Sequence, residues 1–138
     1  MKNIWTNGCY DILHLGHIRL FQYAKSLGDK LIVGIDSDDR VKELKGHSRP
    51  INNEQYRKEI LESIKYIDEV YIFDTSDKLK SLIKEHNIDS IVVGDDYKTK
   101  LVIGSELVKQ TIFFTRIPSL STSQIINDTS NTSPTSHS

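Results

Sequence analysis

Short apolar runs that alternate with helical patterns constrain the fold of this chain more than any other feature. Leu31-Ile32-Val33-Gly34-Ile35 is continuously apolar, which is typical of a strand covered on both faces. Further short strands are predicted at Lys2–Asn7, which has Ile4 and Trp5 at its centre, and at Val70–Phe73, Ile91–Val93 and Thr111–Phe114. Because these runs alternate with helical segments, the sequence predicts an α/β fold, with a mostly parallel sheet of about five strands and helices on both faces.

The intervening segments supply the helical patterns. Ile18, Phe21, Ala24 and Leu27 recur at helical spacing, and Gly28 follows as a stop signal, so a helix is expected over His17–Leu27. Two further helices are predicted from apolar sets that share one face: Tyr56, Ile60, Leu61 and Ile64, and then Leu79, Leu82 and Ile83. Pro50 argues against a helix through the end of the basic segment Val41–Pro50.

Composition indicates a single ordinary domain. The 138 residues suffice for a core without cross-links, and we place the domain at residues 1–127. Residues 128–138 are rich in Ser, Thr and Asn, which predicts a disordered polar tail. A formal net charge of −1 argues against nucleic-acid binding through a broad basic surface. The single cysteine excludes an intrachain disulfide framework and a zinc site built from cysteines.

The N-terminal residues lack the features of a targeting segment. One lysine is followed by Ile4 and Trp5 without the long apolar region of a signal peptide. No run of about 18 apolar residues occurs, so no membrane span is expected. These observations predict a cytoplasmic protein.

The segment Gly8–His17 carries the most suggestive chemistry. His14 and His17 lie three residues apart, with Gly16 between them, where an apolar run gives way to a helical pattern. An open α/β sheet places ligand-binding groups at this junction, and a helix start attracts phosphate through its N–H groups and dipole. Imidazole donors there can stabilise charge that moves between phosphate oxygens. The segment therefore predicts phosphate handling.

Several segments resemble one superfamily. His14-Leu15-Gly16-His17 is similar to the HxGH signature of the nucleotidylyltransferases. Three more segments resemble the small cytidylyltransferases, namely Lys65–Val70 (their RYVDEV), Gly94–Tyr97 (their GDDW) and Arg116–Ser123 (their RTEGIST). The likeness runs from about Lys2 to Ile126 and implies a single Rossmann-like domain. It also implies attack of a substrate phosphate on the α-phosphorus of a nucleoside triphosphate, with release of pyrophosphate.

The same resemblance assigns roles to individual residues. The catalytic groups it implies are His14, His17, Lys45 and Arg116. The nucleotide contacts it implies are Gly8, Cys9, Tyr10, Asp11, Gly16, Asp95, Asp96, Ser121 and Thr122. The contacts to the second substrate are Lys42, Arg57 and Lys65.

Structural roles remain open for some of these residues. Asp11 orients a loop or helps to place a metal ion, and Arg57 binds phosphate or forms a salt bridge on a helix surface. Lys45 binds phosphate or is a solvated lysine of a basic loop. Asp95 and Asp96 contact the nucleotide or cap a strand end.

The substrates also remain open between two branches. The segments Lys65–Val70 and Arg116–Ser123 favour CTP with glycerol 3-phosphate or a related alcohol phosphate. The segments Thr6–His14, Leu44–Pro50 and Asp96–Lys98 resemble the adenylyltransferase domain of ADP-heptose synthesis, which implies ATP and a sugar 1-phosphate. A regulatory module that binds a nucleotide without catalysis is an alternative of another class. The resemblance further implies Mg²⁺ bound with the triphosphate, and a homodimer.

Overall fold

A computed structural model describes residues 1–95 and 100–115 of the chain. It contains a five-stranded sheet in the order β3-β2-β1-β4-β5, and every neighbouring pair is parallel. The strands are β1 (Asn3–Gly8), β2 (Lys30–Asp36), β3 (Glu69–Phe73), β4 (Ser90–Gly94) and β5 (Gln110–Phe114). The helices are α1 (Leu15–Ser26), α2 (Asp38–Lys45), α3 (Glu54–Glu62), α4 (Ser76–Glu85) and the short 3-10 helix η2 (Ser105–Leu107). The predicted α/β fold with a parallel sheet is confirmed.

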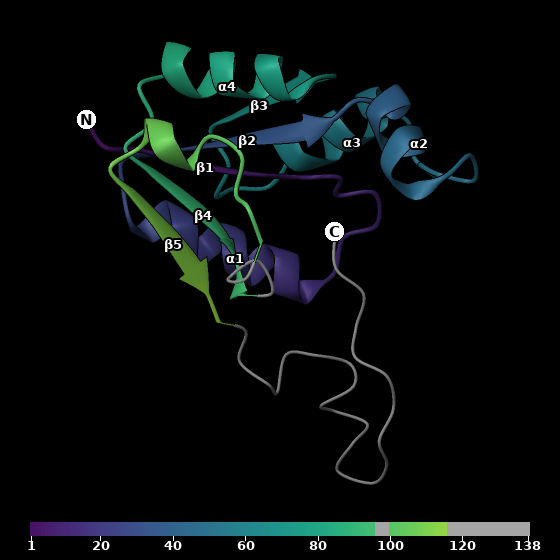
Figure 1. Cartoon of the computed structure of the whole chain (residues 1–138). Coiled ribbons are helices and arrows are strands. Elements are labelled where there is room, and N and C mark those ends of the chain that lie inside the picture. The colour runs from purple at the N-terminus through teal and green to yellow at the C-terminus, as the bar shows by residue number, and fades with distance from the viewer. Residues whose placement is uncertain (96–99, 116–138) are drawn as a thin grey trace, which may run out of the picture.

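Two apolar layers cover the sheet, because alternate strand residues point to opposite faces. Ile4, Val33 and Ile35 pack with Phe21 of α1 and Leu61 of α3 on one face. Trp5, Ile32 and Phe73 pack with Leu79 and Ile83 of α4 on the other face. Figure 1 shows α1 and α4 on opposite sides of the sheet. Both faces of the inner strands β1, β2 and β4 are therefore buried, whereas the edge strands β3 and β5 are only partly covered.

Helix α2 ends before Pro50, as the sequence predicts. The basic segment before Pro50 is helical as far as Lys45, and the helix starts earlier, at Asp38. Ser37 caps it by accepting a hydrogen bond from the Arg40 backbone N–H, and Gly46 ends it with φ of 99°. Pro50 lies beyond this glycine stop, so its effect on the backbone does not reach the helix.

The buried face of α3 differs from the prediction. Tyr56 and Ile60 are 62% and 45% exposed, whereas Leu61 is fully buried as expected. Arg57 takes the place beside Leu61 in the protein interior, with an exposed fraction of 1%. An apolar periodicity could not reveal this arrangement, because the largest buried side chain of the helix is charged.

The order of the strands determines where a ligand can bind. The chain runs outward from β1 to β2 and β3, and then returns to the other side of β1 with β4 and β5. This reversal produces a topological switch point between β1 and β4, and open α/β sheets bind ligands beyond the carboxyl ends of their strands there. Segments that follow β1, β2 and β4 therefore meet at one edge of the sheet.

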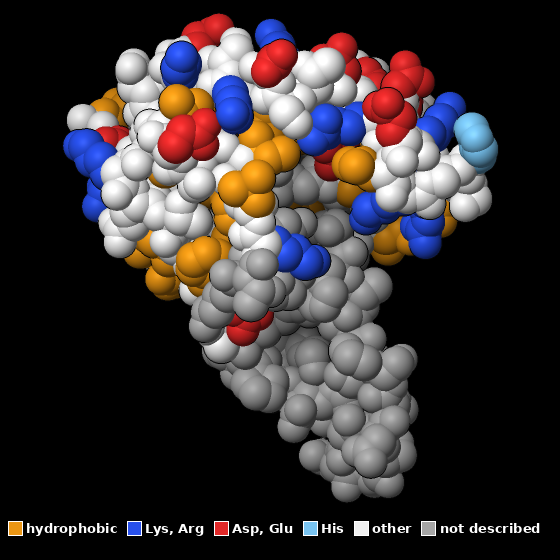
Figure 2. All heavy atoms as spheres, in the orientation of Figure 1, with side chains coloured by type: hydrophobic (Ala, Val, Ile, Leu, Met, Phe, Trp, Pro, Cys, Tyr) orange, Lys and Arg blue, Asp and Glu red, His pale blue; other side chains and the backbone are white. Residues whose placement is uncertain are grey.

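Charge is distributed evenly over the visible face of the protein. Figure 2 shows acidic and basic side chains interspersed on the described residues of this face, next to patches of apolar side chains. This distribution agrees with the net charge of −1. It gives no support to a broad basic surface for nucleic acid.

Gly34 is expected to be essential for packing between β1 and β2. A Cβ atom added there would overlap the Trp5 indole and would also approach Phe73. We expect Gly34→Ala to lower the free energy of unfolding by about 1–3 kcal/mol, the usual cost of overpacking a core. Trp5 is the single tryptophan of the chain, so its fluorescence reports the same change directly during urea unfolding. Unchanged stability together with unchanged Trp5 emission would contradict this packing.

Candidate functional site at the carboxyl edge of the sheet

The two histidines of the Gly8–His17 segment build the start of α1. His14 is the N-cap, and its Nδ1 accepts a hydrogen bond from the Gly16 backbone N–H at 3.0 Å. His17 Nδ1 accepts one from the His14 backbone N–H at 3.1 Å. Because each Nδ1 is an acceptor, each neutral imidazole carries its proton on Nε2. The ring centroids lie 3.9 Å apart, so the capping box fixes the two imidazoles as one unit.

Tyr10 supports this pair from within the core. Its ring packs edge-on against His17, with centroids 5.5 Å apart, and also against Phe21 at 5.2 Å. Tyr10 is only 4% exposed and has a positive φ of 52°. The Tyr10 side chain is thus packed beneath His17, and the nucleotide contact of this residue stays a prediction.

Asp11 orders the loop before α3, which agrees with the loop-orienting role left open above. Its carboxylate accepts hydrogen bonds from the backbone N–H groups of Ile51 and Asn52, at 2.7 and 2.8 Å. Arg49 adds an ion pair at 3.3 Å. Burial favours a higher pKa for the Asp11 carboxyl, but these donors outweigh it and hold the pKa below the ordinary value of 3.8.

We expect Asp11→Asn to destabilise the protein in a pH-dependent way. The asparagine amide turns one acceptor into a donor that faces backbone N–H groups, which should cost about 1–3 kcal/mol at neutral pH. Because the folded-state pKa is lowered, the contribution of the carboxylate is present above its ordinary pKa of 3.8 and is lost as the pH falls through the folded value. Urea unfolding between pH 7 and pH 3 should show the difference from wild type shrink at the acidic end. Glu59→Gln, at an exposed position of α3, is the control, and a pH-independent difference for Asp11→Asn would contradict this account.

Arg57 connects three segments of the site from inside the protein. Its Nη1 donates to the carbonyls of Cys9 and Asp36, at 3.0 and 2.7 Å. Its Nε donates to the Asn52 carbonyl at 2.9 Å, and its Nη2 forms an ion pair with Asp38 at 2.8 Å. The expected contact between Arg57 and substrate phosphate is corrected by this arrangement, because the guanidinium is buried and bonded to the protein. The alternative of a salt bridge is met by Asp38, but the Arg57 side chain is buried in the protein instead of lying on the helix surface.

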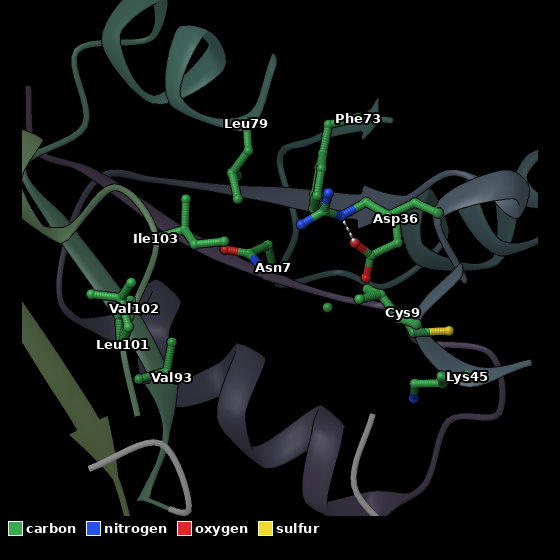
Figure 3. Close-up of a pocket in the computed structure, with 13 residues that line it drawn as sticks. Asn7, Cys9, Asp36, Lys45, Phe73, Leu79, Val93, Leu101, Val102 and Ile103 are labelled. Carbon is green, nitrogen blue, oxygen red and sulfur yellow. Dashed lines mark hydrogen bonds and ion pairs between the residues drawn. The ribbon is translucent and has the colours of Figure 1, made fainter. Parts of the chain in front are cut away.

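A cleft of about 270 Å³ opens at the carboxyl ends of β1, β2 and β4. Gly8 and Cys9 lie along it, with Asn7, Asp36 and Lys45 (Figure 3). Its remaining lining is Arg40, Leu44, Phe73, Leu79, Val93, Leu101, Val102 and Ile103. The cleft thus combines a polar end, built by the segments after β1 and β2, with an apolar wall. Burial raises the pKa of the Cys9 thiol, which gives no sign of an activated nucleophile.

The two lysines of the basic segment are placed differently. Lys45, the last residue of α2, lines the cleft beside Cys9 (Figure 3). Lys42 instead lines a separate shallow hollow together with Asp38, Pro50 and Asn53. Of the two, Lys45 is the lysine positioned to contact a ligand in the cleft.

Lys65 lies at the wrong edge of the sheet for its predicted role. It follows α3 and precedes β3, and so belongs to the amino edge of the parallel sheet. Its ammonium group lies 5.2 Å from the centroid of the Tyr66 ring. The expected contact with the second substrate is therefore corrected for a single subunit.

Several predicted residues fall outside the described part of the chain. Asp95 directly follows β4, at the predicted edge. Asp96, Arg116, Ser121, Thr122 and the polar tail from residue 128 lie outside the described residues, so their assignments stay predictions.

Asp36 and Arg40 are cleft residues that the sequence analysis missed. Arg40 Nε donates to Asp36 Oδ1 at 2.8 Å, and burial raises the pKa of the Asp36 carboxyl despite this partner. The sequence did contain a signal for this ion pair, since Asp36 directly follows the apolar run Leu31–Ile35 and Arg40 lies four residues later. It was hidden because the Asp36–Asp39 stretch also reads as a turn and a helix start.

Comparison with known proteins identifies the family. The model of the cytidylyltransferase-like family matches residues 5–128. The chain belongs to this family. The bifunctional protein HldE of Campylobacter fetus is 46% identical over 124 residues, which cover 90% of this chain and 27% of that protein. HldE of Campylobacter jejuni (strain RM1221) is 47% identical over 125 residues, with 91% and 27% covered. The chain thus spans about a quarter of the length of these curated relatives.

A solved structure supports the same fold for this cytidylyltransferase-like chain. The lipopolysaccharide core biosynthesis protein of Thermoplasma volcanium superposes with a TM-score of 0.70 at 27% identity, and the match covers 85% of this chain and 99% of that one. The Rossmann-like arrangement predicted from the sequence is therefore confirmed.

Residues 1–95 and 100–115 contain no helix with the length and apolar character needed to cross a bilayer. The same residues contain no group of three or more His, Cys, Asp or Glu side chains arranged to hold a metal ion.

Proposed function

We propose that this domain is an adenylyltransferase that uses ATP and a sugar 1-phosphate, such as heptose 1-phosphate, to make an ADP-sugar and pyrophosphate. The observation that carries the reaction type is the rigid His14–His17 pair at the start of α1, at the same sheet edge as the cleft. Family membership agrees with this reaction type.

The choice of ATP is supported by the relatives and by the geometry. The HldE proteins match about nine-tenths of the chain. The segments Thr6–His14 and Leu44–Pro50, which resemble the adenylyltransferase branch, both contribute residues to the cleft, and Arg49 of the second forms an ion pair with Asp11 of the first. Lys65–Val70, which favoured CTP, begins at the opposite edge of the sheet and has no contact with the cleft in one subunit. CTP with glycerol 3-phosphate is thus the second candidate rather than the first.

In the proposed reaction, a phosphate oxygen of the sugar phosphate attacks the α-phosphorus of ATP. The new O–P bond forms as the bond between the α-phosphorus and the oxygen bridging to the β-phosphate breaks, and pyrophosphate leaves with that electron pair. The Nε2–H groups of His14 and His17 stabilise the growing negative charge, and Lys45 neutralises phosphate charge at the rim of the cleft. The role of the protein is positioning and charge stabilisation, without a covalent enzyme intermediate.

Mg²⁺ is expected to bind together with ATP. Its preferred ligands are the substrate phosphates, water and one or two carboxylates, so the chain does not need a metal site of its own. The ion would neutralise charge on the phosphates.

A pyrophosphate-release assay tests the proposal. ATP and CTP are each offered with heptose 1-phosphate, mannose 1-phosphate and glycerol 3-phosphate in the presence of Mg²⁺. We expect release that requires both ATP and a sugar 1-phosphate. Release only from CTP with glycerol 3-phosphate would support the second candidate, and no release with any pair would support a regulatory module.

The homodimer stays a prediction. Light scattering of the purified chain should give a mass of about twice 15.8 kDa if it is correct.

A further inference from the structure

The polar end of the cleft contains an ion pair that the proposed reaction does not use. Asp36 ends β2 and Arg40 lies in the first half of α2, and their side chains are 12% and 16% exposed. Both residues line the cleft, and one carboxylate oxygen of Asp36 accepts a hydrogen bond from the Arg40 guanidinium. Figure 3 shows the other carboxylate oxygen of Asp36 pointing towards the side of Cys9. A buried ion pair is costly to desolvate, and it is weak evidence for stability alone.

Arg40 is held in a single orientation from three sides. Its Nε donates to Asp36 at 2.8 Å, its Nη2 donates to the Ser76 hydroxyl at 3.3 Å, and its guanidinium lies 5.4 Å from the centroid of the Phe73 ring. Residues 1–95 and 100–115 supply no hydrogen-bond acceptor for its Nη1. The guanidinium is therefore a preorganised donor, and binding a ligand to it requires little further loss of side-chain entropy.

Asn7 is oriented in the same way. Its Oδ1 accepts a hydrogen bond from the Trp5 indole at 2.9 Å, so its amide N–H groups face away from the indole. The amide and the guanidinium supply donors at the cleft, and the Asp36 carboxylate supplies an acceptor. Hydroxyl groups both donate and accept hydrogen bonds, and such a mixed set therefore matches them.

The rest of the cleft fits the body of a sugar. Val93, Leu101, Val102 and Ile103 form an apolar wall that can cover the C–H groups of a ring. A volume of about 270 Å³ is near the lower end of typical small-molecule pockets, about 300 Å³. The Gly8–Cys9 end leads to the start of α1, where the phosphate of the same molecule would react.

We propose that Asp36 and Arg40 determine the acceptor by hydrogen bonding the hydroxyl groups of its sugar ring, while the phosphate of the acceptor lies at the Gly8–Cys9 end of the cleft. This inference rests on the proposed function, because it takes the acceptor to be a sugar phosphate. It assigns a specificity role to two residues that lie away from the reacting phosphorus.

The test separates acceptor binding from nucleotide binding. Arg40→Met and Asp36→Asn are compared with Arg19→Met, an exposed residue of α1, using heptose 1-phosphate and ATP. We expect both cleft variants to raise the KM for heptose 1-phosphate at least about tenfold, with the KM for ATP changed by less than about twofold. A KM for heptose 1-phosphate that is unchanged from wild type in the cleft variants would overturn the inference. Parallel increases in the KM values for heptose 1-phosphate and ATP would overturn it as well.

Direct binding keeps the two proposals distinguishable. Isothermal titration calorimetry measures heptose 1-phosphate and glycerol 3-phosphate against each variant without turnover. If the wild-type chain transfers only CMP to glycerol 3-phosphate, the proposed function is wrong. The affinity of each variant for glycerol 3-phosphate then tests whether Asp36 and Arg40 bind hydroxyl groups of the acceptor. If the single variants do not fold, the double variant Asp36→Asn/Arg40→Gln is used instead, because it keeps a neutral hydrogen-bonded pair. A double variant that binds both ligands with wild-type affinity would overturn the inference.

Discussion

His17→Ala should lower turnover by at least about 100-fold while leaving the fold intact. The replacement removes the Nε2–H donor, and loss of one preorganised transition-state donor has effects of that size. It also removes the Nδ1 acceptor that caps the His14 backbone N–H, which should cost about 1 kcal/mol of stability. Steady-state pyrophosphate release and thermal unfolding, measured on the same sample, separate the two effects.

Two amide variants sharpen this test. Asparagine at position 17 can imitate the Nδ1 acceptor, whereas glutamine can imitate the Nε2 donor. We therefore expect His17→Asn to keep stability but not activity, and His17→Gln to keep more activity than His17→Asn. His47→Ala, in the exposed segment before α3, is the matched control and should remain within about twofold of wild type. Wild-type turnover in His17→Ala would exclude a role for this ring in catalysis.

Arg57→Met should produce the largest loss of stability among the substitutions considered. Loss of the Arg57 guanidinium leaves the carbonyls of Cys9, Asp36 and Asn52 without their hydrogen-bond donor, and Asp38 without its ion-pair partner. Breaking such a buried network should lower the free energy of unfolding by about 3–5 kcal/mol. Urea unfolding followed by Trp5 fluorescence measures this loss.

Neighbouring variants distinguish burial from charge. Lys58→Met removes a half-exposed charge that lies 3.5 Å from Glu62 on the same helix, and it should change stability by less than about 0.5 kcal/mol. Arg57→Lys keeps the charge but cannot form the fork of hydrogen bonds, so an intermediate loss is expected. Equal stability of Arg57→Met and Lys58→Met would contradict the structural role of Arg57.

The fold could be predicted from the sequence because its strands carry a strong local signal. The run Leu31–Ile35 is apolar on both faces, and the alternation of strands with helices leaves few topologies besides a parallel sheet. Helix α2 was harder to predict from the sequence, because it is mostly polar and Val41 is its only buried residue. Its signals were the Ser37 cap and the Gly46 stop.

The candidate site could be predicted only in part. The segment Gly8–His17 contains adjacent residues, so its chemistry is visible in one stretch of sequence. The role of Arg57 depends on backbone carbonyls that lie 21 and 48 residues away in the sequence, and no local sequence pattern predicts contacts at such separations. Lys65 shows the opposite problem, since a segment that resembles a family motif lies at the edge of the sheet away from the cleft.

The central claim is transfer of a nucleotide from ATP to a sugar 1-phosphate. The most direct measurement mixes equal concentrations of ATP and CTP with heptose 1-phosphate and Mg²⁺, and identifies the products by mass spectrometry. We predict ADP-heptose and pyrophosphate in equal amounts, formed at least about 100-fold more slowly by His17→Ala. A CDP-linked product, or no nucleotide sugar from the wild-type chain, would contradict this account.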